Sequence, residues 1–311
     1  MRPVRSRGGD KVRLRGVLID DTFAEAFGMR VARVVITGTT LRWAREAALK
    51  FTGFATSVIA CTCEAAIERE LPPEETPDAR PGVSVLLFTM DTGSLGRRLI
   101  ERIGQTVLTC PTANCFDGLP DAPDRVHAGR ALRVFGDGFQ ISKVVDGQRY
   151  WRVPVMDGEC LLQESFGVHK KGVGGGNFLI LAEDGDSALG AAEAAVDAIA
   201  GTPDVILPFP GGIVRSGSKV GARRYAGMIA STNDAYCPTL GPVTQTKLPE
   251  GVNAVLEIVL DGLGAEAVAG AMRAGIEAAC RPGVRVISAG NYGGKLGPYH
   301  LHLRDIMTGA T

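Results

Sequence analysis

One acidic residue, Glu257, interrupts an otherwise apolar segment between residues 255 and 260. Read as a β-strand, this segment places Val255, Glu257 and Val259 on one face, because successive side chains of a strand point to opposite sides. A carboxyl group between two valines is largely removed from water. Burial disfavours the charged form and can raise a carboxyl pKa by roughly 3–5 units. We therefore expect Glu257 to hold a proton near neutral pH and to act as a proton donor.

A solvated strand face is the alternative environment for Glu257, and an internal comparison argues against it. Two parts of the chain, one in each half, share the order strand, helix, strand. Aligning Asp91 with Asp261, each just after its strand, places Leu87 opposite Glu257. The fold then does not require an acid at this position. Because isolated carboxyl groups in apolar surroundings are enriched at active sites, the comparison favours a functional role for Glu257.

Several other catalytic patterns are incomplete in this sequence. The run Gly172–Gly176 lacks the last glycine of a dinucleotide site, so it favours a close approach of the backbone either to a ligand or to another chain. Ser216 and Lys219 match the Ser-x-x-Lys pattern of acyl-enzymes by spacing alone. The cysteines and histidines show no zinc-ligand spacing. We therefore expect no bound metal and no nucleotide.

The composition is that of a globular chain large enough for two domains, with 311 residues, 45% of them hydrophobic and 22% charged. The 34 basic residues balance 34 acidic ones, so no net charge attracts nucleic acid or an anionic membrane. No apolar segment approaches the roughly 20 residues that span a bilayer. Seven cysteines without framework spacing favour reduced thiols and a cytoplasmic location. Residues 1–15 are predicted to be a disordered, basic N-terminal extension.

The expected elements repeat in the same order in both halves of the chain. They are strand 31–37, helix 41–52 and apolar run 56–60 in the first half, and strand 178–182, helix 187–200 and apolar run 205–208 in the second. A glycine in the left-handed conformation is expected to end each helix. A second strand–helix–strand unit, closing with a strand at 106–109 in the first half, completes each copy. We predict an α+β fold made of a duplicated ferredoxin-like α/β sandwich, with lobes at 16–153 and 154–311.

Three segments are too polar and irregular for a core, yet rich in conformationally constrained residues. They are Asp20–Phe27, Pro208–Ile213 and Ser231–Pro238. Loops of this kind on a rigid scaffold commonly carry binding groups. Ordinary capped turns are the alternative interpretation.

These segments, together with Pro72–Pro77, Phe209–Val214, Ser288–Asn291 and Gly293–Gly297, resemble the formylmethanofuran–tetrahydromethanopterin formyltransferase family. The resemblance extends from Gly16 to Met307. It implies transfer of a formyl group between the amine of methanofuran and N5 of tetrahydromethanopterin, without a bound cofactor. It also implies a homotetramer with sites in clefts between subunits. The essential glutamate of the family falls on Glu257.

Direct attack of one amine on the formamide carbon needs no enzyme nucleophile, so the expected catalytic group is a donor to the oxyanion, Glu257. Within the family's motifs, other residues are expected to bind the two carriers through ring stacking, polar contacts or attraction of their anionic tails. These substrate-binding candidates are Asp21, Thr22, Phe23, Phe209, Gly211, Gly212, Arg215, Lys219, Asn233, Asp234, Tyr236, Asn291 and Lys295.

The chain departs from the archaeal pattern in its basic start, in His169–Lys171 and in an insert at Gly241–Thr246, and it uses 26 Arg against 8 Lys. It therefore resembles the bacterial branch, in which the enzyme is a subunit of a formyltransferase/hydrolase complex that oxidises formaldehyde to formate. Docking to hydrolase subunits is expected at these departures. A non-catalytic, metabolite-binding scaffold subunit is the alternative function. Hydrolysis of an N-formyl compound would need a metal or nucleophile motif that the sequence lacks.

Overall fold

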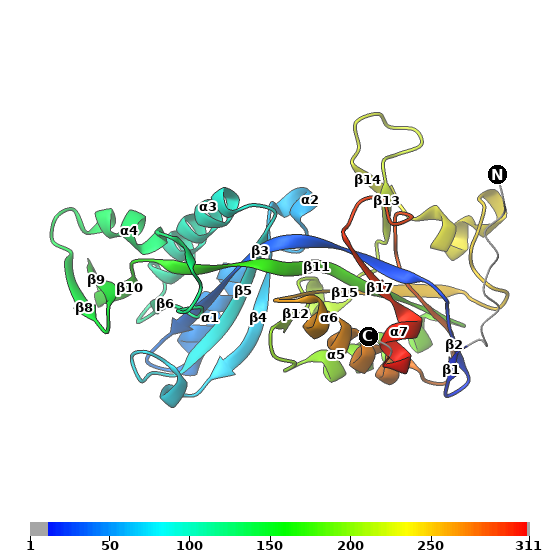
Figure 1. The fold of residues 1–311 in the computed structure, drawn as a ribbon, viewed down its shortest axis with the longest axis horizontal. Coiled ribbons are helices and arrows are strands. Elements are labelled where there is room, and N and C mark those ends of the chain that lie inside the picture. The colour runs from blue at the N-terminus through cyan, green and yellow to red at the C-terminus, as the bar shows by residue number, and fades with distance from the viewer. Residues whose placement is uncertain (1–11, 310–311) are drawn as a thin grey trace.

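Two long antiparallel strands, β3 (Phe23–Thr37) and β11 (Phe166–Ala182), run side by side through the centre of the mixed α/β fold (Figure 1). The computed structural model describes residues 12–309, so residues 1–11 of the predicted extension lie outside the described part. Each long strand contributes to both main hydrophobic cores. Ala24 of β3 packs in the core of the second half and Val34 in that of the first. The two halves therefore share continuous strands.

The main sheet and helix layer of the first half is built from four strands and two long helices. They are β3, α1 (Leu41–Thr52), β4 (Glu64–Leu71), β5 (Gly82–Thr89), α3 (Thr92–Arg102) and β6 (Asn114–Asp117). The strands pair in the order β4-β5-β3-β6. Both helices cover the same face, since Ala47 and Leu99 pack in one core with Val34 and Leu87.

The second half repeats this arrangement. Its elements are β11, α5 (Gly185–Ile199), β12 (Val205–Ile206), β15 (Ala254–Gly262), α6 (Ala265–Ala279) and β16 (Val284–Ser288). The strands pair in the order β12-β15-β11-β16. Ala192 of α5 and Met272 of α6 pack against Phe178 and Ile258, so both helices again lie on one face.

Shorter elements extend the sheet or connect its strands. They are β1 (Arg13–Leu14), β2 (Val17–Ile19), α2 (Val58–Cys61), β7 (Asp124–Val126), α4 (Ala128–Leu132), β8 (Ile141–Val145), β9 (Gln148–Val155), β10 (Gly158–Gln163), β13 (Ser218–Val220), β14 (Ala230–Thr232), β17 (Tyr299–His302) and α7 (Leu303–Thr308). Strand β1 lies within the predicted disordered extension, yet it pairs with β2. No helix between residues 12 and 309 has the length and apolar character needed to cross a bilayer.

Three local expectations are wrong. The run 56–60 does not form a strand, because Ser57 accepts a hydrogen bond from the Ile59 N–H and caps the short helix α2. Residues 106–109 continue α3 through a π-helical turn, and the strand forms later as β6. Gly53 has a φ of −60° and is not left-handed, whereas Gly201 has a φ of +79°.

The change from one core to the other occurs within β11. Val168 still packs in the first core, and Val173 packs in the second. The predicted boundary at residue 154 falls earlier, inside β9. Its hairpin partner β10 also contributes Leu162 to the first core.

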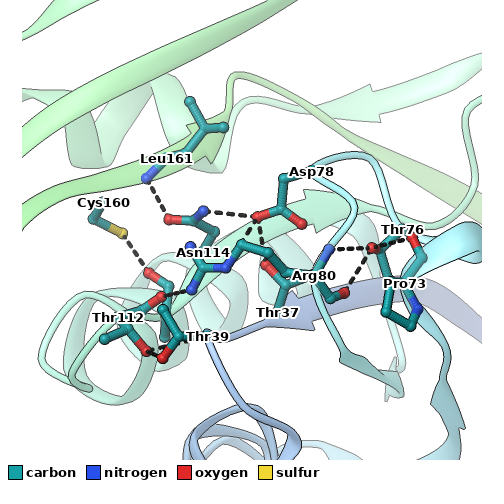
Figure 2. Close-up of polar contacts among 11 residues, drawn as sticks. Thr37, Thr39, Pro73, Thr76, Asp78, Arg80, Thr112, Asn114, Cys160 and Leu161 are labelled. Carbon is teal, nitrogen blue, oxygen red and sulfur yellow. Dashed lines mark hydrogen bonds and ion pairs between the residues drawn. The ribbon is translucent and has the colours of Figure 1, made fainter.

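The segment that follows the Pro72–Pro77 motif is held by buried polar contacts (Figure 2). Asp78 accepts hydrogen bonds from the Thr37 hydroxyl and the Asn114 amide, each at 2.8 Å. Asn114 in turn accepts the Leu161 N–H at 2.8 Å. This network ties the β4–β5 connection to β3, β6 and β10, so the structure assigns the motif's neighbour Asp78 a role in the fold.

The internal alignment of Asp91 with Asp261 is shifted by three residues. Asp91 caps α3, because its carboxylate accepts the Ser94 N–H at 2.8 Å. The residue in that place before α6 is Gly264, three positions after Asp261. With the helix starts aligned, Leu87 corresponds to Leu260 and lies against the helices, as Leu260 does.

The true counterpart of Glu257 is Ser84. Ser84 pairs with Val35, which lies five residues before the N-cap of α1. Glu257 pairs with Leu179, which lies five residues before the N-cap of α5. Both side chains belong to the sheet face opposite the helices. The first half therefore carries a hydroxyl rather than leucine here, and it still has no acid at this position.

We expect Leu87→Ala to lower the free energy of unfolding by ~2–5 kcal/mol, because this fully buried side chain would leave a cavity between α1, α3 and the sheet. Turnover of the folded fraction should not change. Chemical denaturation measures the effect, with Leu49→Ala on the exposed face of α1 as the matched control. Equal losses in both variants would contradict the packing described here.

Candidate active site

A cavity of about 430 Å³ lies at the junction of the two halves. The first half supplies wall residues from β3, α2, β4 and the end of β5, and the second half supplies β11, β15, the β13–β14 hairpin and the loop after β16. Most of the lining is apolar. Its polar side chains are Glu25, Ser57, Glu64, Asn177, Ser216, Ser218, Lys219, Glu257 and Tyr292.

Glu257 lies in the middle of β15, where its backbone is held from both sides. It pairs with Leu179 of β11, and it exchanges two hydrogen bonds with Val214 at 2.8 and 2.9 Å. The neighbouring Ile258 packs against the helices, so the Glu257 side chain points to the opposite face and into the cavity with Val259. Strand pairing thus fixes the position of the acid.

The carboxyl group of Glu257 is surrounded by protein atoms but remains reachable from the cavity. No side-chain hydrogen bond or ion pair engages it within residues 12–309. Desolvation by burial raises its pKa from 4.5 to about 7. The sequence predicted this direction from the apolar neighbours, and the structure agrees. Such a carboxyl can donate a proton at neutral pH and take it back.

Two predicted binding residues, Phe209 and Lys219, line the cavity with Glu257. Lys219 forms an ion pair with Asp234, which brings a third predicted residue to its edge. Glu257 also lines a second, smaller pocket of about 40 Å³, and three further predicted residues line it too. They are Arg215, Asn233 and Tyr236.

The remaining predicted binding residues do not line the cavity. Asn291 donates hydrogen bonds to the Thr22 hydroxyl and the Phe23 carbonyl, both at 3.1 Å, and Phe23 packs between His300 and His302. These contacts organise the adjoining loop. Asp21 and Lys295 are exposed and form no ion pair within the described chain.

The two glycines of the Pro208–Ile213 segment have different environments. Gly211 has a φ of +60° and open space around it. Gly212 has a φ of +76°, and a Cβ there would lie 2.8 Å from a Val196 side-chain atom. Gly212 is thus required for packing against α5, and it does not face the cavity.

Sequence reasoning missed Glu25, which forms part of the cavity wall. Its side chain is 1% exposed, and its carboxylate accepts hydrogen bonds from the backbone N–H groups of Tyr292, Gly294, Leu296 and Gly297 at 2.5–2.9 Å. Although burial opposes ionisation, these four bonds lower its pKa to about 2. Glu25 is therefore an anion around which the loop folds.

A signal for Glu25 was present in the sequence. It is a single acid between Ala24 and Ala26, much as Glu257 is a single acid between apolar residues. Tyr292, which lines the cavity, was also not predicted from the sequence. Its pKa is raised by burial and by the negative charge that Glu257 carries when ionised.

Other reactive groups do not assemble into a catalytic set within residues 12–309. No cluster of three His, Cys, Asp or Glu side chains there is arranged to hold a metal ion. Lys219 contacts Asp234 and not Ser216, so the Ser-x-x-Lys spacing has no structural counterpart. The thiol of Cys237 forms a weak hydrogen bond with the Thr232 hydroxyl, at 3.6 Å, and none with a histidine in the described chain.

We expect Glu25→Ala to destabilise the fold by at least ~2 kcal/mol at pH 7, because hydrogen bonds to a charged group contribute about 1.5–3 kcal/mol each. The pKa of Glu25 is lowered on folding, so its contribution is present above the ordinary carboxyl pKa and is lost as the pH falls toward 2. Thermal melts at pH 7 and pH 2.5 measure this, with exposed Glu250→Gln as the control. Equal destabilisation at both pH values would contradict an ionised Glu25.

Comparisons with known proteins match nearly the whole described region. The family model "Formylmethanofuran-tetrahydromethanopterin formyltransferase" matches residues 12–155, and the model "FTR, proximal lobe" matches residues 158–306. The formyltransferase of Methylobacillus flagellatus is 61% identical over 301 residues, which are 94% of this chain and 99% of the relative. One subunit of the formyltransferase/hydrolase complex of Methylorubrum extorquens is 50% identical, with 94% of this chain and 97% of that protein covered.

A solved structure agrees with these sequence matches. A chain of the Methylorubrum extorquens formyltransferase/hydrolase complex, solved with methylofuran, superposes with a TM-score of 0.92 at 49% identity, covering 96% of this chain and 99% of that one. The high identity over nearly the whole length confirms the resemblance found in the sequence motifs, including its bacterial character. The chain is an enzyme of one-carbon metabolism and belongs to the formylmethanofuran–tetrahydromethanopterin formyltransferase family.

Proposed function

We propose that this chain transfers a formyl group between the amine of a methanofuran-type carrier and N5 of a tetrahydromethanopterin-type carrier. The observation that carries this proposal is the Glu257 carboxyl, which lies at the cavity with a pKa of about 7 and has no side-chain hydrogen-bond partner among the described residues. The identity of the two carriers is inferred from the family to which the chain belongs. Neither a bound metal nor a nucleotide is needed in this scheme.

The proposed reaction is a direct exchange between two amines. The attacking nitrogen forms a bond to the formamide carbon, and the carbonyl oxygen becomes an oxyanion. Protonated Glu257 donates a hydrogen bond or its proton to that oxygen, and a single donor of this kind contributes roughly 3–4 kcal/mol to the transition state. The carbon–nitrogen bond to the departing amine then breaks. That amine gains a proton, the attacking nitrogen loses one, and Glu257 ends as it began.

The groups around Glu257 suggest how carriers are held. Phe209 offers a ring for stacking, and Lys219 offers a cation whose partner Asp234 can release it to an anionic tail. We propose Arg215, Asn233 and Tyr236 as contacts in the small adjoining pocket. The exposed Lys295 and Asp21 and the backbone of Gly211 are proposed as outer contacts. Thr22, Phe23, Asn291 and Gly212 are proposed to shape the loops that carry these groups.

We also infer that the chain is a duplicated ferredoxin-like fold. The identical strand orders, β4-β5-β3-β6 and β12-β15-β11-β16, support this, as do helices on one face of each half. The two family models divide between residues 155 and 158, which supports two lobes meeting near residue 154.

We further propose that the protein works in the cytoplasm as a homotetramer bound to hydrolase subunits. Support comes from the Methylorubrum extorquens relative, which is part of a formyltransferase/hydrolase complex, and from the seven free thiols of this chain. Light scattering of the purified chain should give a mass above the 32.7 kDa monomer. A fully active monomer would rule out a site completed by a neighbouring subunit.

The function is tested by following formyl exchange between the two carriers through ultraviolet absorbance, using purified protein without added metal. We expect Glu257→Ala to reduce turnover at least about a hundredfold, because the oxyanion loses its donor. Turnover of the wild type should fall as the pH rises through 7, since Glu257 then loses its proton. Glu257→Gln keeps a hydrogen-bond donor but no proton, so near-normal turnover in it would restrict Glu257 to hydrogen bonding.

Stability provides the control for these variants. Because folding raises the Glu257 pKa, its ionisation destabilises the fold as the pH rises from 4.5 toward 7. Above pH 7, Glu257→Gln should therefore melt at the wild-type temperature or higher, and Glu250→Gln should match the wild type in turnover. A folded Glu257→Leu protein with full formyl transfer would refute the assignment of Glu257.

A further inference from the structure

Two buried carboxyl groups meet beside the cavity, one from each half of the chain. Asp261 on β15 is 0% exposed, and Glu64 on β4 is 8% exposed. The two carboxyl groups are close enough to share a hydrogen bond when one of them is protonated. Asp261 Oδ1 accepts the Gly175 N–H at 2.9 Å, whereas Oδ2 has no hydrogen-bond donor within residues 12–309. Glu64 Oε1 accepts the Val58 N–H at 3.0 Å.

The contact between the two acids requires a proton. Two carboxylates in hydrogen-bonding contact cannot both be ionised away from water. Burial raises the pKa of both groups, and the negative charge of Glu64 raises the pKa of Asp261 still further. A single proton on Asp261 therefore makes Asp261 the donor and ionised Glu64 the acceptor of their contact.

Other titratable groups near the pair do not affect its protonation. Glu257 lies on the same face of β15, four residues and thus roughly 13 Å along the strand. Glu25 of β3 lines the same cavity, His169 of β11 binds the Leu263 carbonyl at 2.7 Å, and Cys61 ends α2. None of them contributes a charge effect to the pKa of Glu64 or Asp261. The pair therefore responds to pH as a unit.

The two backbone groups that the pair holds belong to opposite walls of the cavity. Val58 begins α2, and residues 57–59 line the side of the first half. Gly175 belongs to an irregular part of β11, and it lines the side of the second half with Gly174. No side chain fits at Gly174, where a Cβ would lie 2.1 Å from Met29 Sδ and 3.2 Å from Asp261 Oδ1. The two acids therefore lie between closely packed parts of the two walls.

We propose that Glu64 and Asp261 are positioning residues, whose single shared proton joins the α2 wall to the β11 wall and so sets the width of the carrier-binding cavity. This inference rests on the proposed function for its effect on carriers. Loss of the proton leaves two buried negative charges, which repel each other and move the α2 segment held by Glu64 away from the β11 wall, while the β3–β11 sheet stays intact. Carrier binding then weakens while the chemistry at Glu257 is unaffected, so KM changes and kcat does not.

The decisive variant is Asp261→Asn. Its amide oxygen can still accept the Gly175 N–H, and its NH2 group can donate to ionised Glu64, so the bridge persists without a shared proton. Glu64→Gln is the reciprocal variant. Asp261→Ala removes the bridge altogether. Glu266→Gln, at an exposed acid in the first turn of α6, is the matched control.

The first readout is the pH dependence of the melting temperature, which needs no activity. Folding raises the pKa of the pair, so the wild type loses stability as the pH rises above the ordinary carboxyl range. At a pH between the ordinary carboxyl pKa and the raised pKa of the pair, Asp261→Asn and Glu64→Gln should each release about one proton fewer on unfolding than the wild type. Glu266→Gln should not differ from the wild type. An unchanged proton release in both amide variants would overturn the shared proton.

The second readout is KM against kcat for formyl exchange. In the wild type, KM for a carrier should rise several-fold at alkaline pH, and in Asp261→Asn this rise should disappear while the pH dependence of kcat remains. Asp261→Ala should have a high KM at all pH values. If KM of Asp261→Asn rises with pH as it does in the wild type, the positioning role is wrong. If neither the wild type nor any variant catalyses formyl exchange, the proposed function is wrong. The number of protons released on unfolding then still tests whether Glu64 and Asp261 share a proton.

Discussion

The pairing of β3 with β11 is the constraint on which the rest of the structure depends. These strands pass through both cores, so the two halves cannot move apart without breaking a continuous sheet. The close approach is possible only because β11 carries glycines where it faces β3. A Cβ at Gly172 would lie 2.2 Å from Val31 Cγ2. The glycine run thus serves packing between strands, and Gly174 and Gly175 also form cavity wall. The sequence left open an approach to a ligand or to another chain, and the structure adds a third role, packing within the chain.

The acidic residues at this junction have three different environments. Glu257 is desolvated without a partner, which raises its pKa and keeps a proton available. Glu25 is also buried, but four backbone N–H groups keep it ionised. Glu64 and Asp261 are buried side by side, which raises the pKa of both. The same side-chain chemistry thus supports proton donation, loop organisation and, as proposed here, wall positioning, and the backbone groups around each carboxyl decide which.

Local sequence patterns predicted the parts of the structure that depend on local forces. The helices at 41–52 and 187–200 and the alternating strand around Glu257 follow from periodicity alone. The full length of β3 could not be predicted this way, because residues 23–30 mix acids, glycine and arginine and are held by pairing with the distant β17 and β11. Glu25 was missed for the same reason, since its partners lie more than 260 residues away. The shifted internal alignment arose because Asp261 is a buried partner of Glu64 and not a helix cap.

The protonation state of Glu257 is the central claim, and infrared difference spectroscopy tests it most directly. The carboxyl band of the wild type minus that of Glu257→Gln isolates this one group across a pH titration. A protonated carboxyl that ionises with a pKa of about 7 is the predicted result. A Glu257 that ionises near 4.5, the ordinary value for a glutamate, would contradict the account of the site.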